Sequence, residues 1–172
     1  FPDPWTYTES ASSNSLNRLL ALPRYYAQHY LDLNGLRLAG NFIKTASFFI
    51  HPVLLGKVLA FLPFIARKYL NEETNNVFLF SLFDLINAIA FKHYCLHYQT
   101  DFKLIFLNSV AHSQHHSWTE ADGFSAEMQT TFEFLDHSIG QLLSIAREDE
   151  PIVISNAFSQ YCSLEKNEYL YR

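Results

Sequence analysis

Apolar residues recur at steps of three and four through the first hundred positions of the chain, which is typical of packed helices. Asn14 or Ser15 can cap the first of these helices, and Pro23 marks a kink or a restart within it. His51-Pro52 breaks a later one, because the residue before a proline disfavours helical backbone. We therefore predict a helical block over residues 1–100. The expected helices cover residues 14–34, 36–50, 53–70 and 77–99.

The pattern then changes. Residues 102–107 form a short apolar run bounded by polar residues, which favours a buried strand, and residues 152–155 form a second one. Between them, apolar residues from Phe124 to Leu142 recur at helical steps and predict an amphipathic helix. A helix between two buried strands is a βαβ unit, for which a parallel sheet is the default. We therefore predict an α/β fold, in which residues 101–172 form a piece of parallel sheet and the helical block forms a cap.

Composition and charge narrow the function classes. Hydrophobic residues make up 49% of the chain and charged residues 17%, which fits a globular domain of 172 residues. The chain has 5 glycines and no GxGxxG or P-loop pattern, which argues against a glycine-rich phosphate loop. The net charge of −5 is uneven, because residues 119–172 carry 3 basic and 10 acidic residues. Neither this segment nor residues 1–118 contain the clustered Lys and Arg that a nucleic-acid-binding surface needs.

Residues 46–66 and 77–98 are the stretches that most resemble membrane spans. A span needs about 20 nearly uncharged residues. Lys57 interrupts the first stretch, and Asp84 and Lys92 lie in the second, where a charge in lipid is unfavourable. We therefore expect no membrane span. No signal peptide is visible, and the sequence assigns no compartment.

Three of the eight histidines, His112, His115 and His116, lie within five residues directly after the first predicted strand. Imidazole is the commonest transition-metal ligand, and open α/β sheets build their sites beyond the strand ends. Asn108 and His112 are four residues apart, which places an amide oxygen and an imidazole on one side of a turn. The segment from Asn108 to Trp118 is therefore expected to be a loop that carries a metal site.

The same histidines fit a second chemistry. His112-x-x-His115-His116 matches the HxxHH box of membrane di-iron desaturases and hydroxylases, and His93-x-x-x-His97 matches an HxxxH box. The charged residues in the apolar stretches make this reading an alternative rather than the lead. If the chain is instead an α/β protein with its metal site after the first strand, His93 and His97 are expected on helix surfaces. Asp84 and Asn87 are then expected on helix surfaces or between paired helices.

Several strings together resemble a known family. Residues 106–118 contain NSVAHSQHHSW, which resembles the NxxAHxQHxxW element of the type I phosphodiesterase/nucleotide pyrophosphatase-like branch of the alkaline phosphatase superfamily. Residues 135–143 resemble the LDxxIGxLL helix that follows the first metal motif of this family. Residues 152–157 resemble a strand that normally ends in Ser-Asp-His-Gly, and residues 3–6 resemble a segment upstream of the helical cap. The resemblance is firm over about residues 100–160 and diffuse over the helical block.

The resemblance implies a parallel α/β sheet and the hydrolysis of a small-molecule phosphate ester, sulfate ester or phosphodiester. It also implies two divalent metal ions, zinc, which stabilise the charge on the transferred group. The implied site residues are the metal ligands His112, Asn108 and His115, the substrate-binding residues His116 and Trp118, and Gln114, which would hold an imidazole in place.

The chain departs from the family pattern at several positions. Asn108 replaces an aspartate, and an amide oxygen is a weaker zinc ligand than a carboxylate. Asn156 and Ala157 fall where the family has the Asp-His pair of the other metal. The family's nucleophilic Ser or Thr has no counterpart in this sequence, so we expect the chain to belong to a longer parent and to be inactive alone. From a different class, a catalytically silent binding domain that kept the fold and lost the metals is the alternative.

Overall fold

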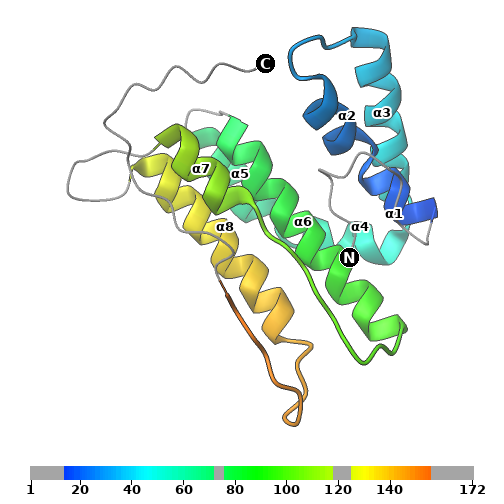
Figure 1. Cartoon of the computed structure of the whole chain (residues 1–172), viewed down its shortest axis with the longest axis vertical. Coiled ribbons are helices and arrows are strands. Elements are labelled where there is room, and N and C mark those ends of the chain that lie inside the picture. Colours follow the sequence, from blue (N-terminus) through cyan, green and yellow to red (C-terminus); the bar gives the residue numbers. More distant parts are fainter. Residues whose placement is uncertain (1–13, 72–75, 118–124, 156–172) are drawn as a thin grey trace, which may run out of the picture.

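The computed structural model describes residues 14–71, 76–117 and 125–155, and every regular element in these ranges is a helix (Figure 1). The long helices α6 and α8 pack side by side with α7 against both, while α3 packs on α1 and α2. The helices are α1 (Asn14–Leu19), α2 (Ala21–His29), α3 (Gly35–Phe48), α4 (Pro52–Leu59), α5 (Leu62–Asn71), α6 (Asn76–His97), α7 (Ser109–Ser117) and α8 (Ala126–Leu143).

The predicted α/β fold, with its alkaline-phosphatase-like parallel sheet, is wrong, because the described residues contain no strand and no sheet. Residues 102–107 and 151–155 lie outside the helices, as expected, but they are not buried strands. Phe102 is 78% exposed and Val153 is 86% exposed. A strand is stable only beside hydrogen-bonded neighbours and against a packed layer. A short apolar run does not reveal whether those neighbours exist.

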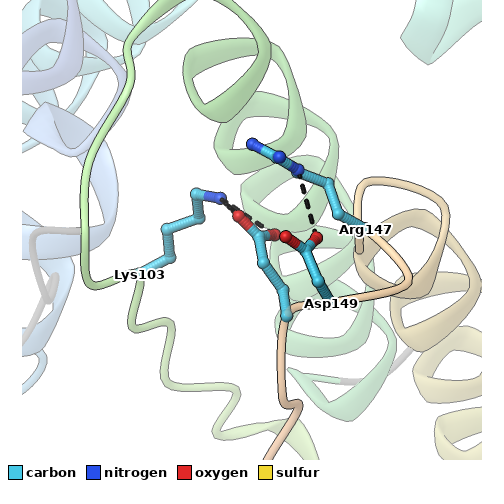
Figure 2. Close-up of polar contacts among 4 residues, drawn as sticks. Lys103, Arg147 and Asp149 are labelled. Atoms are coloured by element: carbon cyan, nitrogen blue, oxygen red, sulfur yellow. Dashed lines mark hydrogen bonds and ion pairs between the residues drawn. The ribbon is translucent and has the colours of Figure 1, made fainter.

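An ion pair links these two non-helical segments near the start of each. Lys103 Nζ lies 3.1 Å from Glu150 Oε1, and the Lys103 ammonium lowers the pKa of Glu150. In the adjoining turn, Arg147 Nε lies 3.4 Å from Asp149 Oδ1 (Figure 2). Both segments then run in the same direction along the α6–α8 pair (Figure 1). No sheet joins the two segments within the described residues.

Local sequence signals explain where the helices begin. Asn34 Oδ1 accepts hydrogen bonds from two backbone N–H groups in the first turn of α3 and so caps that helix. Ser125 Oγ caps α8 in the same way through the Met128 N–H. Pro52 occupies the first turn of α4, where its missing N–H is not needed. The helical pattern expected over residues 14–99 is confirmed by α1 to α6, and the amphipathic helix expected before Leu142 is confirmed by α8.

The central helix of this arrangement is α6. Leu85 and Ile89 on α6 pack against Phe134 of α8 in one apolar cluster. Ala90, on another side of α6, packs with Leu54 of α4 in a second cluster, which also includes side chains from α1 and α3. A helix that is covered on several sides must be apolar around most of its circumference. This explains why the sequence of α6 is so rich in apolar residues.

The same apolar character gives α6 some properties of a membrane span. By length and composition, Phe78–His97 could cross a membrane, and so could α3 and α4 taken together despite a bend of 97° between them. Half of the tested window of α6 is buried inside the structure, and core helices of soluble proteins pass the same test. The expected absence of a membrane span therefore stays a prediction that rests on the charged residues.

Candidate functional site

The histidine segment is a helix rather than the expected loop. The first turn of α7 contains a hydrogen bond of 3.0 Å from the His112 N–H to the Asn108 carbonyl oxygen. Asn108, His112 and His115 follow one another at steps of four and three, which places them on one face of the helix. We call these three residues the α7 stripe. Their spacing thus fits one side of α7, and their role as metal ligands stays a prediction.

His112 packs against α6. Its ring centroid lies 3.7 Å from that of Phe80, with an angle of 31° between the ring planes. The Nε2 atom of His112 is buried, whereas the side chain of His115 is exposed. An ion arriving from solvent can therefore reach His115 directly, but it reaches the buried nitrogen of His112 only if the ring or the helix moves.

Asp84 of α6 caps the start of α7. Its Oδ2 accepts a hydrogen bond of 2.7 Å from the Ser109 N–H, and only 5% of the residue is exposed. A carboxylate in this position satisfies an orphan N–H and faces the positive end of the helix dipole. Burial nevertheless raises the pKa of Asp84 from 3.8 to about 6, because it outweighs the hydrogen bonds from Ser109 and Asn108. Asp84 is thus a helix-pairing group, one of the two roles expected for it.

A seam of buried polar side chains continues from Asp84 between α6, α7 and α8. The Ser81 hydroxyl donates to Thr131 Oγ1 over 3.3 Å. Asn87 is 3% exposed and Ser113 is fully buried, and the side-chain oxygen of each lacks a hydrogen-bond partner among the described residues. Such groups are destabilising unless a partner reaches them. The sequence analysis missed this seam, although the three-residue spacing of Ser81, Asp84 and Asn87 within an apolar helix was a usable signal.

The fit of this site to a metal ion is partial. The described residues contain no group of three or more His, Cys, Asp or Glu side chains that could hold a metal ion. The α7 stripe offers two imidazoles and one amide oxygen, and ligands three residues apart on a helix can bind one ion together. The positions expected for the second zinc, Asn156 and Ala157, lie outside the described residues. The stripe can therefore supply part of one ligand set.

The other expected site residues do not join the stripe in the described part of the chain. Gln114 follows His112 by two residues, and residues so spaced do not face each other on a helix. It is therefore poorly placed to hold that imidazole. His116 belongs to α7, but its side chain lies outside the described residues, and so does all of Trp118. The substrate-binding roles of His116 and Trp118 stay predictions.

The two histidine boxes of the di-iron alternative are far apart in this structure. His112 lies against Phe80 in the first turns of α6, whereas His93 and His97 lie near the end of the same helix. Thirteen residues separate Phe80 from His93, and at 1.5 Å per residue this is roughly 20 Å. Histidine ligands lie about 2 Å from their ion, so the boxes cannot share a metal centre in this arrangement.

Comparison with known proteins assigns neither a family nor a function to this chain. No protein-family model, curated protein or solved structure matches this chain. The likeness to the phosphodiesterase branch therefore stays a resemblance carried by the motif strings, and the function has to be argued from the geometry of α6 and α7.

Proposed function

We propose that this chain takes part in the hydrolysis of a phosphate ester, a sulfate ester or a phosphodiester, with a divalent metal ion at the α7 stripe. The feature that supports this proposal is the helical spacing of His112 and His115 on α7, with Asn108 at its start and bonded through its carbonyl oxygen to the His112 N–H. Zinc is the ion whose preferences suit two imidazoles and an oxygen. A bound ion would supply Lewis-acid chemistry, polarising an oxygen of the ester and stabilising its charge.

Each residue at the stripe has a separate task under this proposal. The exposed imidazole of His115 is the group open to solvent and to an arriving ion. His112 is restrained by its ring contact with Phe80, which limits the positions that its nitrogen atoms can take. Asp84 positions α7 through the Ser109 N–H and so sets where the stripe lies on α6. The attacking nucleophile is not assigned to any residue of this chain.

A catalytically silent binding domain is the second candidate. The buried Nε2 of His112 favours it, because a packed imidazole is a poor receptor for an ion. The apolar side chains displayed by the two non-helical segments also favour it, Phe102 and Val153 among them. Monomeric proteins rarely expose large contiguous apolar patches, and such patches often mark association surfaces. Under this candidate the stripe serves packing, and the segments bind another polypeptide surface.

Zinc titration by calorimetry distinguishes the two candidates. His112→Phe keeps a ring against Phe80 and removes the ligand nitrogens, so the packing of α7 is largely preserved. His29→Ala, which removes an imidazole from α2, is the matched control. The metal proposal expects zinc binding by the unaltered chain and by the control, and affinity at least about tenfold weaker in His112→Phe, as for the loss of a contact that tunes a metal site.

Hydrolysis is measured on the full-length protein with bis(4-nitrophenyl) phosphate and with 4-nitrophenyl sulfate. Turnover that needs zinc and falls sharply in His112→Phe but not in His29→Ala would support the hydrolase. Zinc binding that is absent, or equal in all three proteins, would contradict the metal site and leave the silent binding domain.

A further inference from the structure

Three histidines that the α7 stripe does not use lie together where α4 meets α6. The ring of His51, the residue before α4, lies 5.1 Å from the ring of His93 in α6, centroid to centroid. The ring of His93 lies 4.2 Å from that of His97, one turn further along α6. These are contact distances between rings. The three imidazoles therefore form one cluster that joins the two helices.

His93 is the buried member of the cluster. Only 8% of it is exposed, so its expected place on a helix surface is wrong. Its Nδ1 atom is buried and has no hydrogen-bond partner among the described residues. His97 is exposed, as expected, and its Nδ1 lies 2.7 Å from the His93 carbonyl oxygen. A second proton on His93 would therefore meet little solvent to stabilise its charge.

The charged groups that face His93 also oppose a positive charge on it. Burial lowers the pKa of His93, and His97, Lys57 and His51 lower it further. Lys57 and His51 approach from the α4 side, and His97 lies on α6 itself. Because all three are bases, protonation of one makes protonation of the next less favourable.

Tyr94 is a further ring in contact with His93. Tyr94 meets its ring edge-on, with 5.7 Å between centroids. The Tyr94 hydroxyl in turn hydrogen-bonds to the Ser15 hydroxyl of α1 over 2.6 Å. Within the described part of the chain, no carboxylate is among the groups that shift the pKa of His93. Among these residues, no carboxylate therefore stabilises a protonated His93.

The chain bends sharply at the start of α4, beside this cluster. The axes of α3 and α4 meet at 97°, and the bend lies just before Pro52. Leu54 is the buried side chain of α4, and it packs with Phe48 of α3 and Ala90 of α6. Val58 of α4 also packs against the apolar cluster of α6 and α8, and the histidine cluster lies at the same junction as Leu54.

We propose that His51, His93 and His97 form an acid-sensitive latch, which holds α4 against α6 while the buried imidazole of His93 is neutral and releases it when His93 takes up a proton. Protonation of His93 places a positive charge near the ammonium of Lys57, and like charges repel. The bend before Pro52 allows α4 to move away. The movement uncovers the apolar contact made by Leu54.

The direction of the switch follows from proton linkage. An imidazole with a lower pKa in the closed state than in the open state binds fewer protons when closed. Well above pH 6.5, the ordinary value for histidine, both states are neutral and opening does not depend on pH. As the pH falls through 6.5, the open state is protonated first and becomes more favourable. One linked proton changes the opening constant by up to tenfold per pH unit once the pH is well below 6.5, and by at most about eightfold between pH 7 and pH 5.5.

Amide hydrogen exchange measures this opening directly. The Leu55 N–H bonds to the His51 carbonyl oxygen over 3.0 Å, so its protection reports on the first turn of α4. The Gln129 N–H bonds to the Ser125 carbonyl oxygen over 2.9 Å and serves as the reference in α8. After division by the intrinsic rates, the opening constant of Leu55 relative to Gln129 should rise at least about threefold from pH 7 to pH 5.5. A ratio that does not change would overturn the latch.

Two variants test whether the histidine cluster causes the response. His93→Phe keeps the ring contacts and removes the titrating nitrogens, so the acid response of Leu55 should shrink. Lys57→Met removes a repelling charge and so brings the pKa of His93 in the closed state nearer to its open-state value, which should shrink the acid response of Leu55. His137→Phe in α8 is the matched control, because His137 also packs against aromatic rings, at 4.4 Å from Phe64.

The control should keep the full response of the unaltered chain. If His93→Phe does not fold at pH 7, Lys57→Met decides alone. An undiminished response in Lys57→Met, or in both variants where both fold, would overturn the proposal.

Discussion

The substitution Asp84→Asn removes a buried charge from α6 and keeps an oxygen that can accept the Ser109 N–H. In the folded chain the pKa of Asp84 is raised from 3.8 to about 6, because burial outweighs the hydrogen bonds that it accepts. One pKa unit corresponds to about 1.4 kcal/mol between the two protonation states. A rise of roughly two units therefore means that the ionised carboxylate removes about 3 kcal/mol of stability.

The sign of the pH dependence follows from this rise. A raised pKa means that the folded chain binds the proton more tightly than the unfolded chain does. The contribution of Asp84 is therefore fully present below pH 3.8 and is lost as the pH rises through about 6. At pH 7.5 the Asp84→Asn variant should be more stable than the unaltered chain by up to about 3 kcal/mol. Well below pH 3.8 the two should be nearly equal, because a protonated aspartate and an asparagine are both neutral.

Urea unfolding followed by far-ultraviolet circular dichroism, repeated from pH 3.5 to pH 8, measures this difference. The difference between the pH profiles of the variant and of the unaltered chain gives the contribution of Asp84 to stability, because both proteins share every other titrating group. Asp136→Asn, at an exposed position of α8, is the control and should stay within about 0.5 kcal/mol of the unaltered chain. If Asp84→Asn is instead less stable at pH 7.5, the negative charge stabilises the start of α7 more than burial penalises it, and the reasoning is refuted.

Three further substitutions test the packing, the capping and the exposed surface. Phe134→Ala should lower the free energy of unfolding by about 3–5 kcal/mol in a urea titration, because this side chain is fully buried between α8 and α6. Ser125→Ala should lower it by about 1 kcal/mol, because the N-cap of α8 is lost. Val153→Lys should reduce the binding of a hydrophobic dye and change the unfolding free energy by less than about 0.5 kcal/mol. Undiminished dye binding would argue against an association role for this segment.

The helices could be predicted from the sequence because their signals are local. Helix α8 repeats apolar residues at steps of three and four, and Ser125 stands at its start as a cap. The sheet could not be predicted in the same way. Residues 102–107 carry the local pattern of a buried strand, but a strand is stabilised by partners distant in the chain. Among the described residues, this segment is held near its start by the ion pair between Lys103 and the Glu150 side chain, and Phe102 stays exposed.

For the candidate site, the sequence predicted which residues share a face but not what surrounds them. The spacing of Asn108, His112 and His115 puts them together on any helix. The contact of His112 with Phe80 depends on how α7 packs on α6, and nothing in either segment alone encodes it. The same holds for Asp84, which caps a helix that begins 25 residues later in the chain. Long-range pairs of this kind leave no periodic signal in a single sequence.

Asp84 and His93 lie on the same helix and respond to acid in opposite directions. Burial raises the pKa of Asp84, so acidification below about pH 6 stabilises the contact between α6 and α7. Burial and neighbouring bases lower the pKa of His93, so acidification below pH 6.5 weakens the contact between α6 and α4. Between pH 6.5 and pH 3.8 the chain should therefore loosen at α4 while the helix that carries the stripe stays in place. A uniform loss of protection across α4 and α7 in this range would mean that the two contacts are not independent.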